Sequence, residues 1–436
     1  MAKRYFVHTL GCKLNQFDAA RVEGLLRAGG LERTDDPAAA DVVVLNTCTV
    51  TARADAEGRR LARLYRRLAP NARIVAAGCY AQRDPEGLAA LGVFDAVVPL
   101  AERERLPREL LGEEACAAQP PGLFFADAAR AYLRVQEGCN LRCSYCVIPS
   151  VRGPSRSFEP APLLEEARRL VAAGVREIGL TGVNTGEWGR DLEPKRELAD
   201  LLEAFLAAEW PRRADDDGPA VRFRLNSLEP RTLTPRLLAL IAAAPDRLAP
   251  HVQVPLQSGS DRTLAAMRRN YRTAFYRDVV EGAAARVPGI CLGADVIAGF
   301  PGETDDDQET TRAFVESLPL AYLHVFSYSP RPGTPAATMP GRPPADVARR
   351  RTNELRAAGA RLGRAFRERL LGTTQQALVL DTPAGDGRLR ALTGNYVELR
   401  LPAGAAPAGA VVAARLAAVE RDGKLVRAER VAAPIR

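Results

Sequence analysis

The chain has 436 residues, enough for two or three domains of ordinary size, which excludes a miniature scaffold held together by disulfides. Hydrophobic residues make up 47% and charged residues 26%, which excludes global disorder and fibrous sequence. The net charge of +8 permits an anionic partner without identifying one. No apolar run reaches about 18 residues and no signal peptide is evident, so we expect a cytoplasmic protein with no membrane contact.

Residues 1–118 alternate short apolar segments with helical ones. Strands are expected at residues 5–10, 41–46 and 73–78, each followed by a helix. This βαβ alternation predicts an open parallel sheet. The proline-rich stretch at residues 119–122 is expected to be a linker.

Residues 131–371 repeat the alternation and end in a long helix expected at 345–370. Six strands are expected, at residues 133–135, 177–180, 222–225, 251–254, 292–297 and 322–326. This pattern predicts a full or partial α/β barrel. Residues 372–436 change to short valine and leucine runs cut by glycine and proline, which predicts a small β-barrel. The expected fold class is therefore α/β with a C-terminal β-barrel.

The strongest chemical signal is a set of three cysteines directly after the first expected barrel strand. Cys139, Cys143 and Cys146 have the spacing Cys-x3-Cys-x2-Cys. Thiols stay reduced in the cytoplasm, so this spacing indicates metal ligands rather than disulfides. Three thiolates on one loop can hold three irons of a cubic 4Fe–4S cluster and leave the fourth iron open. Zinc is the alternative, but closed zinc sites need four ligands.

A second set of three cysteines is spread along the N-terminal segment. Cys12, Cys48 and Cys79 each lie one or two residues beyond an expected strand. The carboxyl ends of parallel strands meet at one edge of a sheet, so these thiols are expected to converge. The alternative is three separately buried thiols. Cys116 and Cys291 fit no such pattern, and we expect both to be buried or inert.

The loop from Cys139 to Cys146 resembles that of the radical S-adenosylmethionine (SAM) superfamily. Along the whole chain the sequence is similar to the methylthiotransferase family, in which a three-cysteine domain, a radical SAM barrel and a TRAM domain follow one another. The blocks that carry the resemblance are residues 46–48, 146–149 with 152–153, 251–260 and 295–304. The resemblance implies domains at residues 1–118, 131–371 and 372–436.

The resemblance also implies a transferase that uses SAM and two 4Fe–4S clusters, one held by each cysteine triad. In that family the reaction places a methylthio group on C2 of an adenosine. Residues 11–16 and 324–334 look most like the branch that acts on N6-threonylcarbamoyladenosine next to the anticodon of tRNA. The alternatives are isopentenyladenosine in tRNA, an aspartate of a ribosomal protein, and a non-catalytic metal- or RNA-binding module.

Polar residues at the ends of the expected barrel strands are candidates for SAM binding, which the resemblance favours over ordinary loop chemistry. They are Gly182, Asn184, Ser227, Glu229, Gln253 and Gln257. His8, His251 and His324 lie in apolar strand contexts. We expect these histidines to be hydrogen-bonded core or lining residues without a catalytic role.

Two expected helices carry clusters of arginine, which makes them candidates for RNA contacts. The candidate residues are Arg59, Arg63 and Arg66 on the first helix and Arg356 and Arg364 on the second. The expected partners are a tRNA substrate and an electron donor protein, with no DNA.

Overall fold

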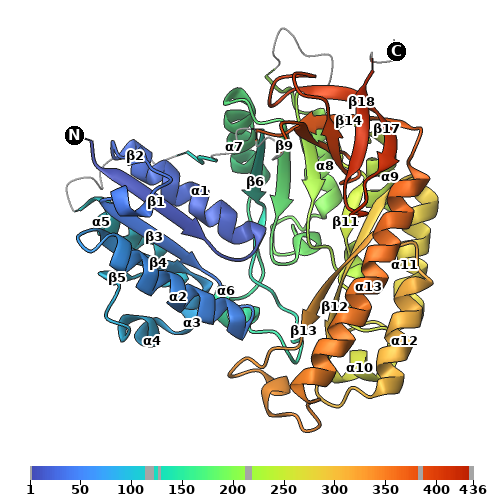
Figure 1. Cartoon of the computed structure of the whole chain (residues 1–436), viewed down its shortest axis with the longest axis horizontal. Helices are drawn as coiled ribbons and strands as arrows, with labels where there is room; N and C mark the ends of the chain where they lie inside the picture. Colours follow the sequence, from blue (N-terminus) through green and yellow to red (C-terminus); the bar gives the residue numbers. More distant parts are fainter. Residues whose placement is uncertain (1, 113–121, 126–128, 212–218, 382–385, 432–436) are drawn as a thin grey trace. The chain divides into compact units, whose positions relative to one another are not determined.

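The computed structural model describes residues 2–112, 122–125, 129–211, 219–381 and 386–431. The chain divides into two compact units (Figure 1). The first unit comprises Met1–Ala126, Glu137–Ser155 and Ser329–Ala337, and the second comprises Asp127–Gln136, Arg156–Tyr328 and Thr338–Arg436. The first unit therefore combines the N-terminal segment with two short segments from later in the chain. Residues 119–121 of the expected linker lie outside the described residues.

The first unit is built on a sheet with the strand order β2-β1-β3-β4-β5, and all neighbouring strands are parallel, which confirms the prediction. The strands are β1 (Arg4–Thr9), β2 (Glu32–Arg33), β3 (Val42–Thr47), β4 (Arg73–Gly78) and β5 (Ala96–Val97). The long strands β1, β3 and β4 match the expected ones. The edge strands β2 and β5 are too short to show an alternating pattern, so the sequence does not predict them.

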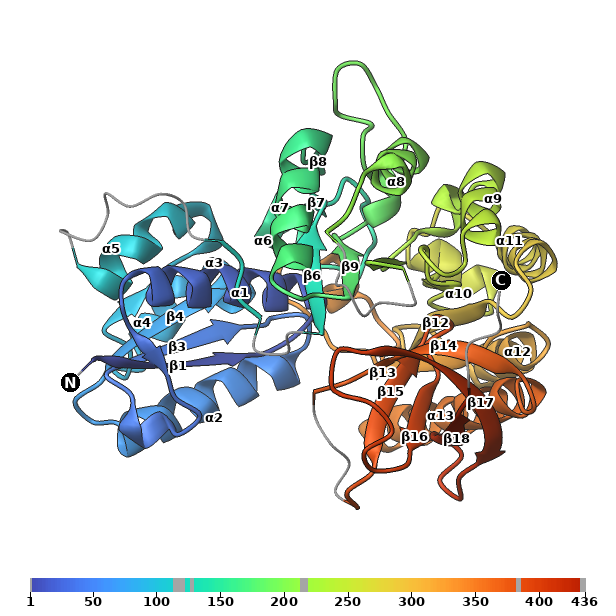
Figure 2. The same ribbon diagram turned by 90° about the horizontal axis from the view of Figure 1, so that it is seen from above.

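Helices cover both faces of this sheet (Figure 2). Leu61 of α2 packs with Val43, whereas Leu26 of α1 packs with Val44 on the other face. Strand β3 is consequently buried along its whole length, which explains its continuous apolar run. The helices are α1 (Lys13–Ala28), η1 (Pro37–Ala39), α2 (Ala52–Leu68), α3 (Cys79–Arg83), α4 (Pro85–Ala89), η2 (Leu100–Arg105), α5 (Leu106–Leu111) and α6 (Ile148–Arg152).

The second unit contains the six expected strands of the α/β region. They form two parallel sheets with the orders β10-β9-β6 and β11-β12-β13, which confirms a partial barrel. The strands are β6 (Arg130–Arg134), β9 (Glu177–Thr181), β10 (Arg222–Leu225), β11 (His251–Gln253), β12 (Cys291–Ala298) and β13 (Tyr322–Ser327). Two short strands, β7 (Gln136–Glu137) and β8 (Arg156–Ser157), pair with each other.

Helices alternate with these strands, as expected. They are α7 (Pro160–Ala172), η4 (Thr185–Glu187), α8 (Leu198–Ala207), η5 (Pro230–Thr232), α9 (Pro235–Ala243), α10 (Asp261–Ala266), α11 (Thr273–Arg286), α12 (Asp305–Glu316) and α13 (Ala345–Arg369). The short helix η6 (Pro335–Thr338) lies mostly in the first-unit segment Ser329–Ala337. The long helix α13 matches the predicted one within a residue. No helix of the described residues is both long enough and apolar enough to span a bilayer.

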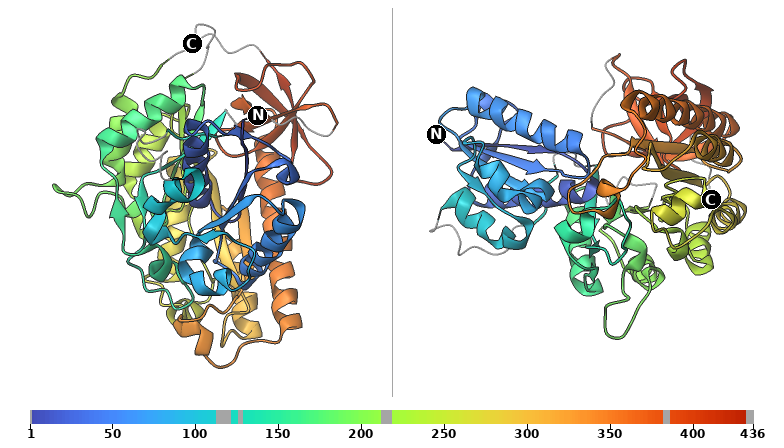
Figure 3. Two further views of the ribbon diagram at one scale, coloured as in Figure 1. Left: turned by 90° about the vertical axis from the view of Figure 1, so that its left-hand side faces the viewer. Right: turned by 90° about the horizontal axis from the view of Figure 1, so that it is seen from below.

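The C-terminal strands close into a barrel with the order β14-β15-β16-β18-β17, which confirms the predicted β-barrel (Figure 3). They are β14 (Thr374–Val379), β15 (Leu389–Thr393), β16 (Glu398–Leu401), β17 (Val411–Val419) and β18 (Val426–Arg430). The barrel core is continuous with Phe366 of α13 and with Cys291 of β12. Tyr396, the aromatic residue of this segment, packs against His251 with ring centroids 4.5 Å apart. Its ring therefore joins the barrel to the α/β region of the same unit.

Candidate active site

Cys12, Cys48 and Cys79 lie at the carboxyl edge of the five-stranded sheet, as its parallel topology predicts. Cys12 precedes α1, Cys48 directly follows β3, and Cys79 begins α3 directly after β4. A Cβ atom on Gly11 would lie 2.8 Å from the Cys48 Sγ, and the φ of +99° at Gly11 also favours glycine. The thiols of Cys12 and Cys48 are close enough to influence the pKa of Cys79. The three cysteines therefore converge.

Burial shifts the pKa of two thiols of this N-terminal triad. It raises the pKa of the Cys79 thiol to about 12, against the lowering effect of the neighbouring Arg152 guanidinium. Burial also raises the pKa of Cys48, whereas the Cys12 side of the triad is exposed. Iron binds the thiolate and not the thiol, so a cluster held here would require these thiols to lose their protons.

Arg152 is a buried cation that contacts this triad from helix α6. Its side chain is only 1% exposed, and its Nε lies 3.3 Å from the Cys79 Sγ. Its Nη1 donates to Glu137 at 3.0 Å, and its Nη2 donates to Asn15 Oδ1 at 2.7 Å and to Asp18 at 2.9 Å. The segment that carries the second cysteine triad thus also supplies a positive charge to the first.

The loop that carries Cys139, Cys143 and Cys146 is closed by its own flanks. A Cβ atom on Gly138 would lie 1.9 Å from the Pro154 carbonyl oxygen, so glycine is required there. The Cys139 N–H donates to the Gly153 oxygen at 3.1 Å, and the Cys146 N–H donates to the Cys143 oxygen at 3.2 Å. All three cysteines are half-buried.

The segment Ser329–Ala337 contacts both cysteine motifs within the first unit. Arg331 is buried, and it donates to Thr49 at 2.9 Å and to the buried Asp55 at 2.5 Å. At the other end of the segment, the Ala336 N–H donates to the Ser144 oxygen at 2.8 Å. Ser144 lies inside the second triad, and Thr49 follows Cys48 of the first. This segment therefore fixes the two motifs in one structural unit.

The donor set of these six cysteines fits two 4Fe–4S clusters. None of the six forms a disulfide, and each triad offers three sulfur ligands, which leaves one iron of a cubic cluster open. Within the described ranges, no three His, Cys, Asp or Glu side chains surround a single ion position. A cluster asks for a different arrangement, because each cysteine binds a different iron. Cys291 is buried as expected, and Cys116 lies outside the described residues.

Two of the candidate SAM residues form a tight turn after β9 in the second unit. A Cβ atom on Gly182 would come within 2.6 Å of the Gln136 side-chain oxygen, so only glycine fits. The Asn184 N–H donates to the same oxygen at 2.9 Å. Asn184 is buried, and its Oδ1 has no hydrogen-bond partner among the described residues. A buried acceptor of this kind fits a ligand with an ammonium or hydroxyl donor.

Ser227 and Gln257 combine strand-end positions with backbone strain. Their φ angles are +56° and +72°, a region that non-glycine residues rarely occupy. Such strain persists where the surroundings impose it and gathers at binding sites. The surroundings here are backbone bonds: the Ser227 oxygen accepts from Thr185 at 3.1 Å, and the Gln257 N–H donates to the Asp295 oxygen at 2.7 Å.

Glu229 and Gln253, by contrast, use their side chains within the protein. Glu229 forms an ion pair with the buried Arg269, and burial nevertheless raises the pKa of Glu229. Gln253 Nε2 donates to both carboxylate oxygens of Asp295, at 2.7 and 2.8 Å. Contact of these two residues with SAM stays a prediction. Such a contact would have to form beside these existing bonds or replace them.

The three histidines differ in exposure. His8 Nδ1 lies 2.7 Å from the Tyr65 hydroxyl, and the buried His251 pairs through Nε2 with the Tyr322 hydroxyl at 2.9 Å. Both fit the expectation of hydrogen-bonded core residues. The side chain of His324, in contrast, is 49% exposed.

His324 belongs to a polar group on one face of the sheet β11-β12-β13. Leu323 and Ser327 of β13 face α13, so the alternating residues His324 and Phe326 lie on the opposite face. His324 Nδ1 is 3.1 Å from Asp295 Oδ1, and Phe326 is 44% exposed. This face therefore carries a hydrogen-bonded His–Asp pair beside an exposed aromatic ring.

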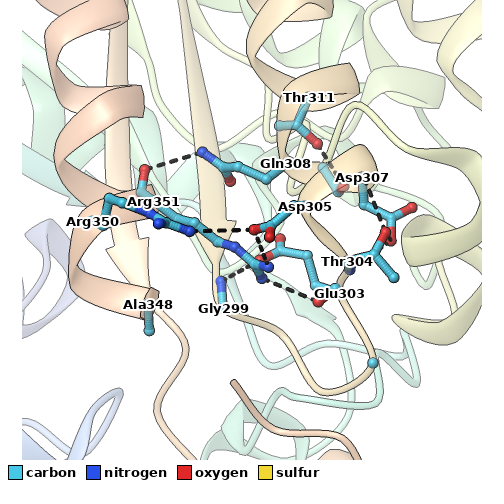
Figure 4. Close-up of polar contacts among 12 residues, drawn as sticks. Gly299, Glu303, Thr304, Asp305, Asp307, Gln308, Thr311, Ala348, Arg350 and Arg351 are labelled. Carbon is cyan, nitrogen blue, oxygen red and sulfur yellow. Dashed lines mark hydrogen bonds and ion pairs between the residues drawn. The ribbon is translucent and has the colours of Figure 1, made fainter. Parts of the chain in front are cut away.

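The turn between β12 and α12 is held by helix α13 (Figure 4). The buried carboxylate of Glu303 accepts from the Gly299 N–H at 2.7 Å and from Arg351 Nη1 at 2.8 Å. Arg351 also donates to the exposed Asp305 at 2.8 Å. A Cβ atom on Gly299 would lie 2.8 Å from the Cβ of Ala348, so α13 packs directly on this turn.

The five arginines proposed for RNA contact differ in how much of their charge is free. Arg63 and Arg356 are exposed, although Arg356 makes one long bond of 3.4 Å to the Val325 oxygen. Arg364 pairs with Glu368, and Arg59 donates to the Tyr80 hydroxyl. Arg66 bonds the carbonyl oxygens of Val93, Pro70 and Ala72 and pairs with Asp95. Contact with RNA stays a prediction for all five, and Arg63 and Arg356 suit it best.

Arg152, Arg331 and Asp55 are prominent in this geometry, but sequence reasoning did not select them. Arg152 lies in one of the family-like blocks and Arg331 lies in another, so the blocks were the available signal. The sequence does not reveal which residues they contact, because Arg331 and Asp55 are separated by 276 residues.

Comparison with known proteins identifies the family. Residues 4–99 match the family described as Uncharacterized protein family UPF0004, and residues 133–315 match the Radical SAM superfamily. The chain is 35% identical to the threonylcarbamoyladenosine tRNA methylthiotransferase MtaB of Bacillus subtilis, over 82% of this chain and 81% of the relative. It is also 35% identical to the tRNA-2-methylthio-N(6)-dimethylallyladenosine synthase of Acidothermus cellulolyticus, over 90% of this chain and 80% of the relative.

Among solved structures, the fold is similar to that of the radical S-adenosylmethionine methyltransferase TsrM from Kitasatospora setae with cobalamin and a [4Fe-4S] cluster bound. The TM-score is 0.54 at 18% identity, and the match covers 77% of each chain. This likeness concerns the fold alone. The chain therefore belongs to the radical SAM methylthiotransferases, a family of tRNA-modifying transferases that use SAM and 4Fe–4S clusters.

Proposed function

We propose that this protein methylthiolates C2 of N6-threonylcarbamoyladenosine in tRNA, next to the anticodon. Cys139, Cys143 and Cys146 would hold the cluster that binds SAM, and Cys12, Cys48 and Cys79 would hold a second one. The clusters and two SAM molecules supply electron transfer, sulfur, a methyl group and hydrogen-atom abstraction. An electron donor protein would reduce the clusters, and tRNA places the reaction in the cytoplasm.

The observation that carries the choice of substrate is the polar group around His324. A threonylcarbamoyl group ends in a carboxylate and a hydroxyl, which need hydrogen-bond donors and acceptors. The half-exposed His324 faces Asp295 through Nδ1, so its Nε2 is left for a ligand. In the neutral ring with the proton on Nδ1, this Nε2 can accept from the hydroxyl of the threonylcarbamoyl group. His324 lies on a strand that leads into a block resembling this branch. Blocks at residues 11–16 and 324–334 support the same assignment.

A second candidate substrate is isopentenyladenosine. Its side group is apolar and would suit the exposed ring of Phe326, two residues along the same strand. Relatives named for the dimethylallyl substrate are as similar in sequence as those named for the threonylcarbamoyl one. The two substrates therefore have to be separated by experiment.

The residues of this chain would divide the remaining work. Asn184 and the strained turns at Ser227 and Gln257 would orient SAM. Two SAM-dependent events on different clusters need close positioning, because a sulfur donor must meet the adenine carbon in the right order. The contacts of Arg152 and of the segment Ser329–Ala337 would supply this positioning inside the first unit.

Mass spectrometry of tRNA nucleosides from cells with and without the gene tests the proposal. We expect 2-methylthio-N6-threonylcarbamoyladenosine to disappear on deletion and to return with the wild-type gene. Cys48→Ala should fail to restore it. Cys291→Ala, which changes a buried cysteine outside both triads, is the matched control and should restore it. Loss of the methylthio-isopentenyl nucleoside instead would establish the second candidate.

A further inference from the structure

Arg152 carries a positive charge into the protein interior and directs it at a sulfur atom. Its side chain is 1% exposed, and its Nε faces the Cys79 Sγ at 3.3 Å, within the range of an N–H to sulfur hydrogen bond. Burying a cation is unfavourable unless its surroundings offset the lost hydration. The groups that contact Arg152 therefore indicate which part of the protein its charge stabilises.

The nearby carboxylates do not account for the whole arrangement. Glu137 accepts from Arg152 at 3.0 Å, but it also pairs with Arg103 at 3.0 Å. Asp18 accepts from Arg152 at 2.9 Å on the Nη2 side. The remaining nitrogen of the guanidinium, Nε, makes its contact with the Cys79 Sγ and not with a carboxylate. One N–H of Arg152 is therefore directed at a thiol of the N-terminal triad.

We propose that Arg152 is a positioning residue which raises the reduction potential of the cluster held by Cys12, Cys48 and Cys79. A hydrogen bond to a ligating thiolate and a nearby positive charge both stabilise the more negative, reduced state of an iron–sulfur cluster. The effect is strong here because Arg152 is out of water, where electrostatic interactions are weakly screened. This inference rests on the proposed assignment of the three cysteines as cluster ligands.

The position of Arg152 in the chain gives this interaction a second consequence. Arg152 follows Cys146 by six residues, and α6 begins two residues after Cys146. Val147 and Val151 of this segment pack with Cys79 in one buried cluster. The same short segment, residues 146–152, therefore carries a proposed ligand of one triad and the cation beside the other, which ties the electrostatics of the N-terminal cluster to the placement of the loop with the second triad.

The test isolates the N-terminal cluster in the full-length protein. Replacing Cys139, Cys143 and Cys146 together by alanine leaves only the N-terminal triad, and the reconstituted protein is titrated with dithionite while the reduced cluster is followed by electron paramagnetic resonance. Arg152→Met in this background should lower the midpoint potential. Arg152→Lys keeps the charge without the planar guanidinium and should lower it less.

Arg103→Met is the matched control. It removes the other arginine that pairs with Glu137 but does not reach the Cys79 sulfur, so the potential should stay at that of the parent. If Arg152→Met does not fold, as judged by circular dichroism of the apoprotein, the shift of Arg152→Lys decides. Intact clusters with equal potentials in the parent and the Arg152 variants would overturn the inference alone. Failure of the alanine parent to assemble a cluster would overturn the assignment of the N-terminal ligands and the inference with it.

Discussion

Replacing Arg351 by methionine should loosen the turn between β12 and α12. The guanidinium donates to Glu303 and to Asp305, both at 2.8 Å. Asp305 is 76% exposed, so that pair contributes at most about 1 kcal/mol. The Glu303 side chain is 2% exposed, and removing one partner of a buried ion pair costs about 3 to 5 kcal/mol because the other charge stays behind. We expect a loss of that size in the local stability of the turn.

The loss should depend on pH. Burial already raises the pKa of Glu303, and the absence of Arg351 should raise it further. A carboxyl group whose folded pKa lies above its unfolded value favours the folded state only while it is protonated. The deficit of Arg351→Met should therefore be larger near pH 7.5 than near pH 5. Adding Glu303→Gln removes the stranded charge, so the double variant should recover about half of the loss.

Hydrogen exchange measured by mass spectrometry gives this local stability directly, because a chain with two compact units need not unfold in one step. Peptides covering residues 299–308 should exchange about a hundredfold faster or more in Arg351→Met, since 1.4 kcal/mol corresponds to tenfold. Arg350→Met is the matched control: Arg350 is 58% exposed and pairs only at the surface, so it should cost less than about 0.5 kcal/mol. Equal exchange in the two variants would refute the reasoning.

Three further predictions address the cysteines, a half-buried histidine and RNA binding. Cys143→Ala should abolish 5′-deoxyadenosine formation from SAM, whereas Cys48→Ala should keep it measurable and lose only the methylthio product. Equal loss of 5′-deoxyadenosine in both folded variants would contradict the assignment of different functions to the two triads. Burial lowers the pKa of His8 below 6.5, so the unfolded chain takes up its proton first and stability should fall as the pH drops below about 6.5. Thermal melts at several pH values should show this acid-side loss reduced in His8→Gln, and an unchanged profile would argue against it. Arg63→Gln should lower the slope of log affinity for tRNA against log salt by about 1 while leaving SAM cleavage without RNA unchanged, and an unaltered slope would remove Arg63 from the RNA contacts.

The sequence predicts the parts of this fold that depend on local pattern. Strand β3 carries a recognisable apolar run, whereas β10 alternates arginine with phenylalanine and leucine. The convergence of Cys12, Cys48 and Cys79 follows from parallel topology alone. The edge strands β2 and β5 have two residues each, too few for any periodicity. Their existence depends on pairing with longer neighbours, which is a property of the folded sheet.

Tertiary contacts are the part that sequence pattern does not reveal. Helical periodicity places Arg66 on the polar face of α2, yet only the structure shows that its guanidinium bonds nearby carbonyl oxygens. Gln253 was a reasonable SAM candidate by position, but its Nε2 is bonded to Asp295. Arg152 meets Cys79 across 73 residues of sequence, and no spacing rule connects them.

The most direct test of the central claim uses purified, anaerobically reconstituted protein with SAM and a reductant. Equal amounts of two tRNAs, one carrying N6-threonylcarbamoyladenosine and one carrying isopentenyladenosine, compete in the same reaction, and the nucleosides are measured by mass spectrometry. We predict that the methylthio group appears on threonylcarbamoyladenosine and that iron analysis gives about eight irons per chain, four for each cysteine triad. Methylthiolation of isopentenyladenosine, or of neither tRNA by protein with both clusters intact, would contradict the account.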